Sequence, residues 1–127
     1  MSYWVTLAYA DSPAKVGSHQ EGGTYVAFRK TELLHGQYIT VGSDNAELNV
    51  TYNYSPNICA ALHQEGLRWL SGKVARDCIG ALAIAVRQLG TECDNDYWEP
   101  TKGNAGYALS ILLNWAKQHP TAVFHVD

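Results

Sequence analysis

The sequence predicts an α+β fold: an antiparallel sheet of four to five strands with helices packed on one face. Residues 47–55 alternate apolar and polar side chains without a break, as a strand with one buried and one solvated face does. Residues 72–89 and 102–119 instead repeat apolar side chains at helical spacing. Short, glycine-containing connections join the strand-like stretches of the first half, which favours antiparallel pairing.

Length and composition indicate one domain, residues 1–127, with a core of its own. Apolar residues make up 46% of the chain and charged residues 17%, as in soluble globular proteins. We see no signal peptide and no apolar run of membrane-spanning length, so we expect a cytoplasmic protein without a membrane partner. An odd cysteine count (Cys59, Cys78 and Cys93) then suggests reduced thiols.

Five stretches are expected to form strands, and the strand at 47–55 is placed in the middle of the sheet. The expected strands are residues 2–10, 24–30, 37–41, 47–55 and 122–126. Residues 11–23 are polar and glycine-rich, which predicts a long loop. Residues 31–36 are expected to link two strands through a short helical turn at Glu32-Leu33-Leu34, and residues 42–45 to form a turn.

Capping residues mark the ends of three expected helices. The expected helices are about residues 56–65, 72–89 and 102–119. Ser55 is the expected N-cap of the first helix and Pro56 its first residue. The second begins at residue 71 or 72, and Gly90 supplies its C-terminal cap. Thr101 caps the third helix, whose two apolar stripes predict contacts with the sheet and with a partner chain, and hence a homo-oligomer.

The start of the third helix is the first candidate site. Helix N-termini attract anions, because their amide groups lack partners and the helix dipole is favourable there. Lys102 adds a cation, Thr101 and Asn104 add polar groups, and Tyr97 or Trp98 can stack on a base. The ordinary alternative is a capped helix preceded by an aromatic residue, since no phosphate-binding fingerprint is present.

The polar face of the strand at 47–55 is the second candidate. Amide side chains both donate and accept hydrogen bonds, so a row of them can recognise a polar ligand. A solvent-facing strand explains the same pattern. The predicted ligand-binding residues of the two candidates together are Asn49, Thr51, Asn53, Tyr97, Trp98, Thr101, Lys102 and Asn104.

The sequence gives little evidence for metal binding or catalysis. Cys59 and His63 are four apart and would share a helical face, but two further ligands for a metal are missing. Residues 94–96 resemble the opening of a calcium loop, and Trp98 and Glu99 break the pattern. We therefore expect no metal and no cofactor, and no catalytic residue can be named.

The net charge and the positions of the basic residues restrict the kinds of partner that we expect. The net charge is −3 and the nine basic residues are scattered, which argues against binding an extended nucleic acid. A small phosphorylated or nucleotide ligand needs only one or two cations and some amides, so it stays among the expected partners.

Several short motifs recur together in one group of proteins. They are the residues of 49–56 (NVTYNYSP), Gly72-Lys73, Leu89-Gly90, Asp96-Tyr97-Trp98, Thr101, Gly103-Asn104-Ala105 and residues 112–115. Through them the chain resembles a group of small proteins of actinobacterial phages and mobile elements, over roughly its C-terminal two-thirds. The resemblance implies a short accessory protein acting inside an infected or lysogenic bacterium, and it assigns no activity.

Three functions remain open. The first is binding of a small nucleotide-like ligand without turnover, by analogy of setting with phage sponges that sequester immune signals of the host. The alternative is a protein–protein inhibitor or immunity-type protein that uses the acidic, aromatic loop at residues 92–99. The third is a small hydrolase whose residues cannot be named.

Overall fold

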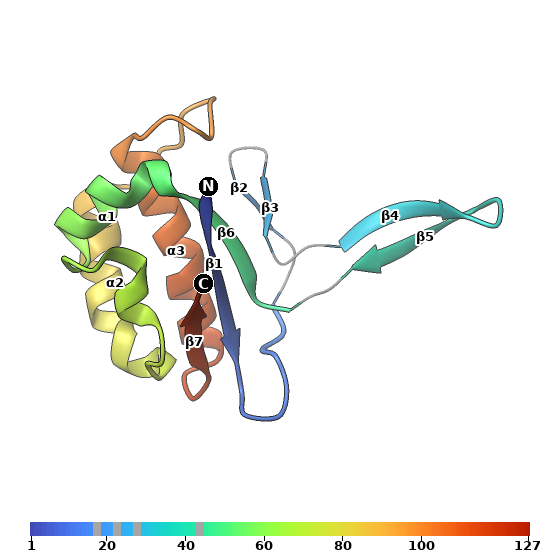
Figure 1. The fold of residues 1–127 in the computed structure, drawn as a ribbon, viewed down its shortest axis with the longest axis horizontal. Coiled ribbons are helices and arrows are strands. Elements are labelled where there is room, and N and C mark those ends of the chain that lie inside the picture. The colour runs from blue at the N-terminus through green and yellow to red at the C-terminus, as the bar shows by residue number, and fades with distance from the viewer. Residues whose placement is uncertain (17–18, 22–23, 27–28, 43–44) are drawn as a thin grey trace.

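A computed structural model describes residues 1–16, 19–21, 24–26, 29–42 and 45–127 (Figure 1). The strands are β1 (Ser2–Ala8), β2 (His19–Glu21), β3 (Thr24–Val26), β4 (Arg29–Leu34), β5 (Gln37–Gly42), β6 (Glu47–Thr51) and β7 (Val123–Val126). The helices are α1 (Ser55–Ala61), α2 (Ala75–Leu89), α3 (Lys102–Gln118) and the 3-10 helices η1 (Tyr52–Tyr54) and η2 (Gly66–Leu70). The α+β class predicted from the sequence is confirmed.

The main sheet is antiparallel and has three strands in the order β6–β1–β7. The expectation of one sheet with four or five strands is wrong, because β2 pairs with β3 and β4 pairs with β5 in two separate hairpins. The strand at the centre is β1, and β6 lies beside it rather than in the middle. The N-terminal strand is central because both of its edges are paired, one with β6 along residues 2–6 and the other with β7 along residues 5–8.

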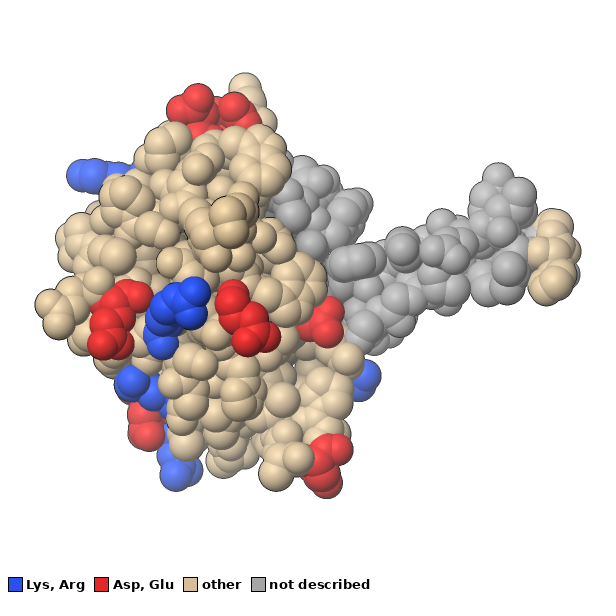
Figure 2. Space-filling view, viewed as in Figure 1, with Lys and Arg blue, Asp and Glu red and all other residues tan. Residues whose placement is uncertain are grey.

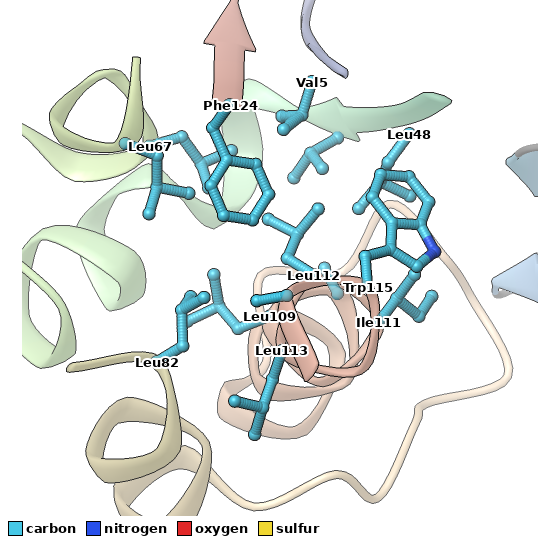
Figure 3. Close-up of a cluster of buried hydrophobic side chains, with 14 of the residues drawn as sticks. Val5, Leu48, Leu67, Leu82, Leu109, Ile111, Leu112, Leu113, Trp115 and Phe124 are labelled. Atoms are coloured by element: carbon cyan, nitrogen blue, oxygen red, sulfur yellow. The ribbon is translucent and has the colours of Figure 1, made fainter. Parts of the chain in front are cut away.

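The helices cover one face of this sheet, and the core lies between them (Figures 1 and 3). Pairing of Val5 with Leu48 and of Leu7 with Phe124 places these four side chains on the same face. All four are fully buried. Trp115 of α3 packs against them, so the period-two pattern of the strands and the helical pattern of α3 meet in one core.

Helix α3 is buried on two sides, as its two apolar stripes predict. One side faces the sheet through residues that include Leu112 and Trp115, and the other packs along α2 (Figure 3). Leu82 of α2 meets Leu109 and Leu113 of α3 in this second layer. Helix α2 thus occupies the side of α3 for which a partner chain was expected, and a homo-oligomer remains a prediction.

The strand predicted at residues 47–55 ends early, at Thr51. The Thr51 side chain accepts a hydrogen bond from the Asn53 amide (3.2 Å) and so begins η1. Ser55 is therefore the first residue of α1 and not its N-cap, which is Tyr54. Helix α1 stops at Ala61, four residues before the expected end.

Helix α2 begins at Ala75, later than the expected residue 71 or 72. The preceding residues bond to β7 instead: the Gly72 amide donates to the Phe124 carbonyl (2.8 Å), and the Phe124 amide donates to the Lys73 carbonyl (3.0 Å). Two predicted helix termini are confirmed. Gly90, with φ +77°, follows the C-terminus of α2, and Thr101 caps the N-terminus of α3.

The first half differs most from expectation. β2 lies within the long loop expected at 11–23, and Glu32-Leu33-Leu34 belong to β4 rather than to a helical turn. The described parts of the strands expected at 24–30 and 37–41 are confirmed as strand. Residues 17–18, 22–23, 27–28 and 43–44 lie outside the described residues, and with them parts of the expected loop, strand and turn.

Candidate functional site

The loop between α2 and α3, residues 91–100, contains no helix or strand, and yet hydrogen bonds from other elements hold it at positions between 94 and 100. It runs over the N-terminal end of α3 and against η1 and the end of β6. Both candidate sites predicted from the sequence meet here, because the loop side chains and the strand β6 contact each other directly.

Asn104 organises the inside of the loop. Its side chain is 2% exposed. Its Oδ1 atom accepts a hydrogen bond from the Asp94 amide (2.8 Å). Its Nδ2 group donates to the carbonyl oxygens of Asp96 (3.0 Å) and Glu99 (2.9 Å). One buried amide therefore satisfies three backbone groups that no helix or strand pairs, which fixes the course of the loop.

Tyr97 joins the loop to β6. Its side chain is buried, and its hydroxyl donates to the Asn49 carbonyl (3.0 Å) and accepts from the Thr51 amide (3.1 Å). These two groups point away from β1 on the edge of β6, so the phenol takes the place of a neighbouring strand. The hydroxyl of buried Tyr54 donates in turn to the Tyr97 carbonyl.

Two asparagines outside the loop hold its C-terminal part. Asn53 of η1 donates from Nδ2 to the Trp98 carbonyl (2.8 Å). Asn57 of α1 donates from Nδ2 to the Pro100 carbonyl (2.9 Å). Three separate elements, η1, α1 and α3, thus bind the loop backbone through side chains, and the loop has one defined shape.

Two glycines of α3 allow the preceding chain to lie directly on the helix. A Cβ atom on Gly103 would stand 1.7 Å from the Glu92 carbonyl oxygen, and one on Gly106 would stand 1.7 Å from the Gly90 carbonyl oxygen. Only a residue without a side chain fits such an approach. The start of α3, expected to offer free amides, is therefore covered by residues 90–92 on the side of these two glycines.

The outer surface of the loop is acidic and carries one large aromatic side chain. Trp98 is 56% exposed. Around it the four carboxylate residues are exposed; they are Glu92, Asp94, Asp96 and Glu99. Figure 2 shows carboxylates gathered at the end of the molecule where Figure 1 places this loop. We call residues 92–99 the acidic ridge.

The aspartates of the acidic ridge also shape it. Asp94 accepts a hydrogen bond on Oδ1 from the Asp96 amide (2.9 Å), and Asp96 accepts one on Oδ1 from the Trp98 amide (3.0 Å). Two such turns in succession set the direction in which Trp98 leaves the backbone. The tryptophan is consequently presented by a fixed support.

The structure joins seven of the eight predicted site residues, all except Lys102, through hydrogen bonds within the loop and to its neighbours. Three of them direct polar atoms inward, since Thr51 caps Asn53, Thr101 accepts from the Asn104 amide (3.1 Å), and Asn104 binds the loop. Asn49 takes part through its backbone carbonyl. The side chains that remain accessible for a partner are Asn53, Trp98 and Lys102.

Sequence reasoning missed Tyr54 and Asn57 as anchors of the loop. Tyr54 sits at an apolar position of the alternating pattern, which indicates burial and says nothing of its hydroxyl. Asn57 lies in the first turn of a helix, where asparagine is common for local reasons. Their partners lie 43 residues away, so no local signal identifies them.

Cys59 and His63 do not form a pair on one helix face. Helix α1 ends before His63, whose ring stacks on Trp69 with centroids 5.4 Å apart and whose Nδ1 accepts from the Glu65 amide (3.1 Å). A Cβ on Gly66 would stand 3.2 Å from the Cys59 sulfur, so the thiol lies against that backbone. Among the described residues, no group of three or more histidine, cysteine or carboxylate side chains could hold a metal ion.

Burial raises the pKa of the Cys78 thiol; Lys73 lowers it and Asp77 raises it by smaller amounts. The thiol therefore stays protonated at neutral pH and serves as a small apolar group of the core. Cys93, in contrast, is exposed on the acidic ridge. No pocket forms among the residues that the structure describes.

Comparisons with protein-family models, with curated proteins and with solved structures find no match for this chain. In the described ranges, no helix has both the length and the apolar character needed to cross a bilayer.

Proposed function

We propose that this protein acts by binding another protein, and that the acidic ridge is the surface it presents to a basic partner. One observation carries the proposal: Trp98 is 56% exposed on a loop that three elements hold in place. Tryptophan is enriched among the residues that dominate binding energy at protein interfaces. A rigid support adds to this, because little conformational freedom is lost when the partner binds.

The charges around Trp98 indicate the kind of partner. The acidic ridge carries four exposed carboxylates close to Trp98 in the chain, and the first cation after them is Lys102. Such a field attracts a positively charged surface and accelerates encounter at low salt. The ridge would contribute specificity through charge and affinity through the ring, which is how an inhibitor or immunity-type protein covers a basic target.

The test is affinity capture from a lysate of a bacterial host, followed by reconstitution with the purified partner. We compare the wild type with Trp98→Ala, with the double change Glu92→Gln/Glu99→Gln, and with Ile84→Ala as a control. Ile84 is a large apolar side chain that is 60% exposed on α2 and is not part of the ridge. The glutamates are chosen for this change because the carboxylates of Asp94 and Asp96 accept hydrogen bonds from loop amides and so shape the loop.

Loss of the tryptophan is expected to weaken binding by about thirtyfold or more, as for a residue at the centre of an interface. The double glutamine variant should bind more slowly at low salt and lose the salt dependence of association. Ile84→Ala should bind as the wild type does. Equal capture by the wild type and Trp98→Ala would refute the proposal.

The small-ligand hypothesis keeps one supporting observation, the exposed Lys102 next to the exposed Trp98. A thermal-shift screen against cyclic dinucleotides, cyclic trinucleotides, NAD, ADP-ribose and cyclic ADP-ribose isomers tests it, because a ligand that binds the folded state raises Tm. A shift that Lys102→Ala abolishes would favour a nucleotide ligand over a protein partner. Consumption of that ligand would instead indicate an enzyme.

A further inference from the structure

The β4–β5 hairpin extends away from the helices and the main sheet (Figure 1). Its strands pair from Arg29 with Gly42 to Leu34 with Gln37. The two residues between them, His35 (φ 51°) and Gly36 (φ 77°), both lie in the left-handed region, as a tight two-residue hairpin turn requires. Within the described residues, β4 and β5 pair only with each other.

In the main sheet, other parts of the chain contact both outer edges. On the outer side of β7, Val74 forms a bridge to Val123, and Lys73 and Gly72 exchange hydrogen bonds with Phe124. On the outer side of β6, the Tyr97 hydroxyl binds the edge groups of Asn49 and Thr51, and β3 lies near the same strand. Proteins cover edges in this way because unpaired strand groups recruit other strands. Within the described residues, no other segment pairs in this way with the outer edges of the β4–β5 hairpin.

The register fixes which backbone groups of the hairpin point outward. In a two-residue hairpin the pair that flanks the turn is hydrogen-bonded, and bonded pairs then alternate with non-bonded ones. Leu34 and Gln37 therefore form hydrogen bonds with each other, and so does every second pair of residues after them along the hairpin. The N–H and C=O groups of residues 38, 40 and 42 point outward from β5, and those of residues 29, 31 and 33 point outward from β4.

The sequences of the two edges differ in charge. β4 (Arg29–Leu34) contains Arg29, Lys30 and Glu32, and charged residues are a common means of protecting an edge. β5 (Gln37–Gly42) contains no charged residue and no proline, and Tyr38 to Val41 are all residue types that favour strands. Protection is therefore present in the sequence of β4 and absent from that of β5.

We propose that the outer edge of β5 pairs antiparallel with the same edge of a second copy of the chain, and joins two hairpins into one four-stranded sheet. An antiparallel pair of identical strands obeys a twofold axis, so one uncovered edge serves as both halves of the contact. An uncharged strand meets its own copy without placing like charges opposite each other. A two-stranded hairpin alone is marginally stable in water, and a sheet of four strands is not.

The experiment measures the mass of the full chain by sedimentation over a range of concentrations. The wild type is expected to be a dimer that dissociates on dilution. Thr40→Pro removes an outward amide from β5 in each copy and leaves the inward bonds of the hairpin, so the dissociation constant should rise about tenfold or more. Thr31→Pro makes the same change on β4 and should leave the dimer unchanged.

A second pair of variants controls for the case in which the proline changes unfold the hairpin itself. Thr40→Lys keeps every backbone amide and adds a charge to the β5 edge of each copy, which protects an edge from pairing, so it should also weaken the dimer, and Thr31→Lys should not. A wild type that stays monomeric at every concentration overturns the proposal. So does a dimer that Thr31→Pro and Thr40→Pro weaken equally. The acidic ridge takes no part in this contact, and Trp98→Ala should leave the dimer intact.

Discussion

The loop at residues 91–100 and the β4–β5 hairpin differ both in secondary structure and in how other elements hold them. The loop has no regular secondary structure, but side chains from η1, α1 and α3 bind its backbone. The hairpin has regular strands and a tight turn, but its strands pair only with each other within the described residues. Regular structure and attachment to the core are thus separate properties in this protein.

The physical reason lies in where each region satisfies its backbone groups. The hairpin satisfies half of them internally through its own ladder of hydrogen bonds between β4 and β5. The loop cannot do so, because its irregular course leaves carbonyl and amide groups unpaired, and a buried unpaired group is costly. Asn104 and Tyr97 supply the missing partners. The loop consequently depends on a few side chains, and the following changes test that dependence.

The largest effect is expected from Gly106→Ala. The new Cβ would stand 1.7 Å from the Gly90 carbonyl oxygen, so α3 and the chain after α2 must move apart. We expect unfolding to become easier by about 3 kcal/mol or more, measured by denaturant titration. Gly80→Ala is the matched control, since nothing lies within 4 Å of its Cβ. That helical change should stabilise by about 0.5–1 kcal/mol, and similar losses from both changes would contradict the close approach.

Asn104→Ala should cost about 2–3 kcal/mol of unfolding free energy, because the Asp94 amide loses its partner and the Asp96 and Glu99 carbonyls each lose one of their two hydrogen bonds. Asn114→Ala on the exposed side of the same helix is the control and should be neutral or slightly stabilising. Proteolysis between α2 and α3 should become faster in Asn104→Ala alone. An unchanged cleavage rate would show that the loop is held by something other than this amide.

Tyr97→Phe should cost about 1–2 kcal/mol, because it removes only the hydroxyl that joins Asn49 and Thr51 at the edge of β6. The sharper readout is hydrogen exchange of the Thr51 amide, which should lose protection while the amides of α3 keep theirs. Tyr52→Phe next to this edge serves as the comparison and should be close to neutral. Full protection of the Thr51 amide in Tyr97→Phe would contradict the assigned bond.

Replacement of residues 29–42 by a short glycine–serine linker should change the stability of the remaining chain least, by about 1 kcal/mol or less. The measurement is made at a concentration where the wild type is monomeric, since dimerisation adds apparent stability by mass action. A loss as large as that of Asn104→Ala would mean that the hairpin is part of the core after all, and would end the contrast between the two regions.

Much of the C-terminal half is predictable from local sequence. Thr101 caps α3, Gly90 ends α2, and the apolar stripes of α3 are buried as their spacing predicts. These features depend on residues within a turn or two of each other. The candidate site is predictable only in part: the polar residues of β6 and the start of α3 do meet, but several of their side chains bind the protein itself.

The sequence by itself determined the α+β class, the three helices and the alternating strands, because period and capping are local properties of the chain. Only the tertiary structure decided that β1 lies between β6 and β7, that Tyr97 covers the edge of β6, and that Asn104 holds the loop. Tyr97 reaches partners 46 and 48 residues away. Such contacts form because buried polar groups need partners, and which partners they find depends on packing that no local pattern records.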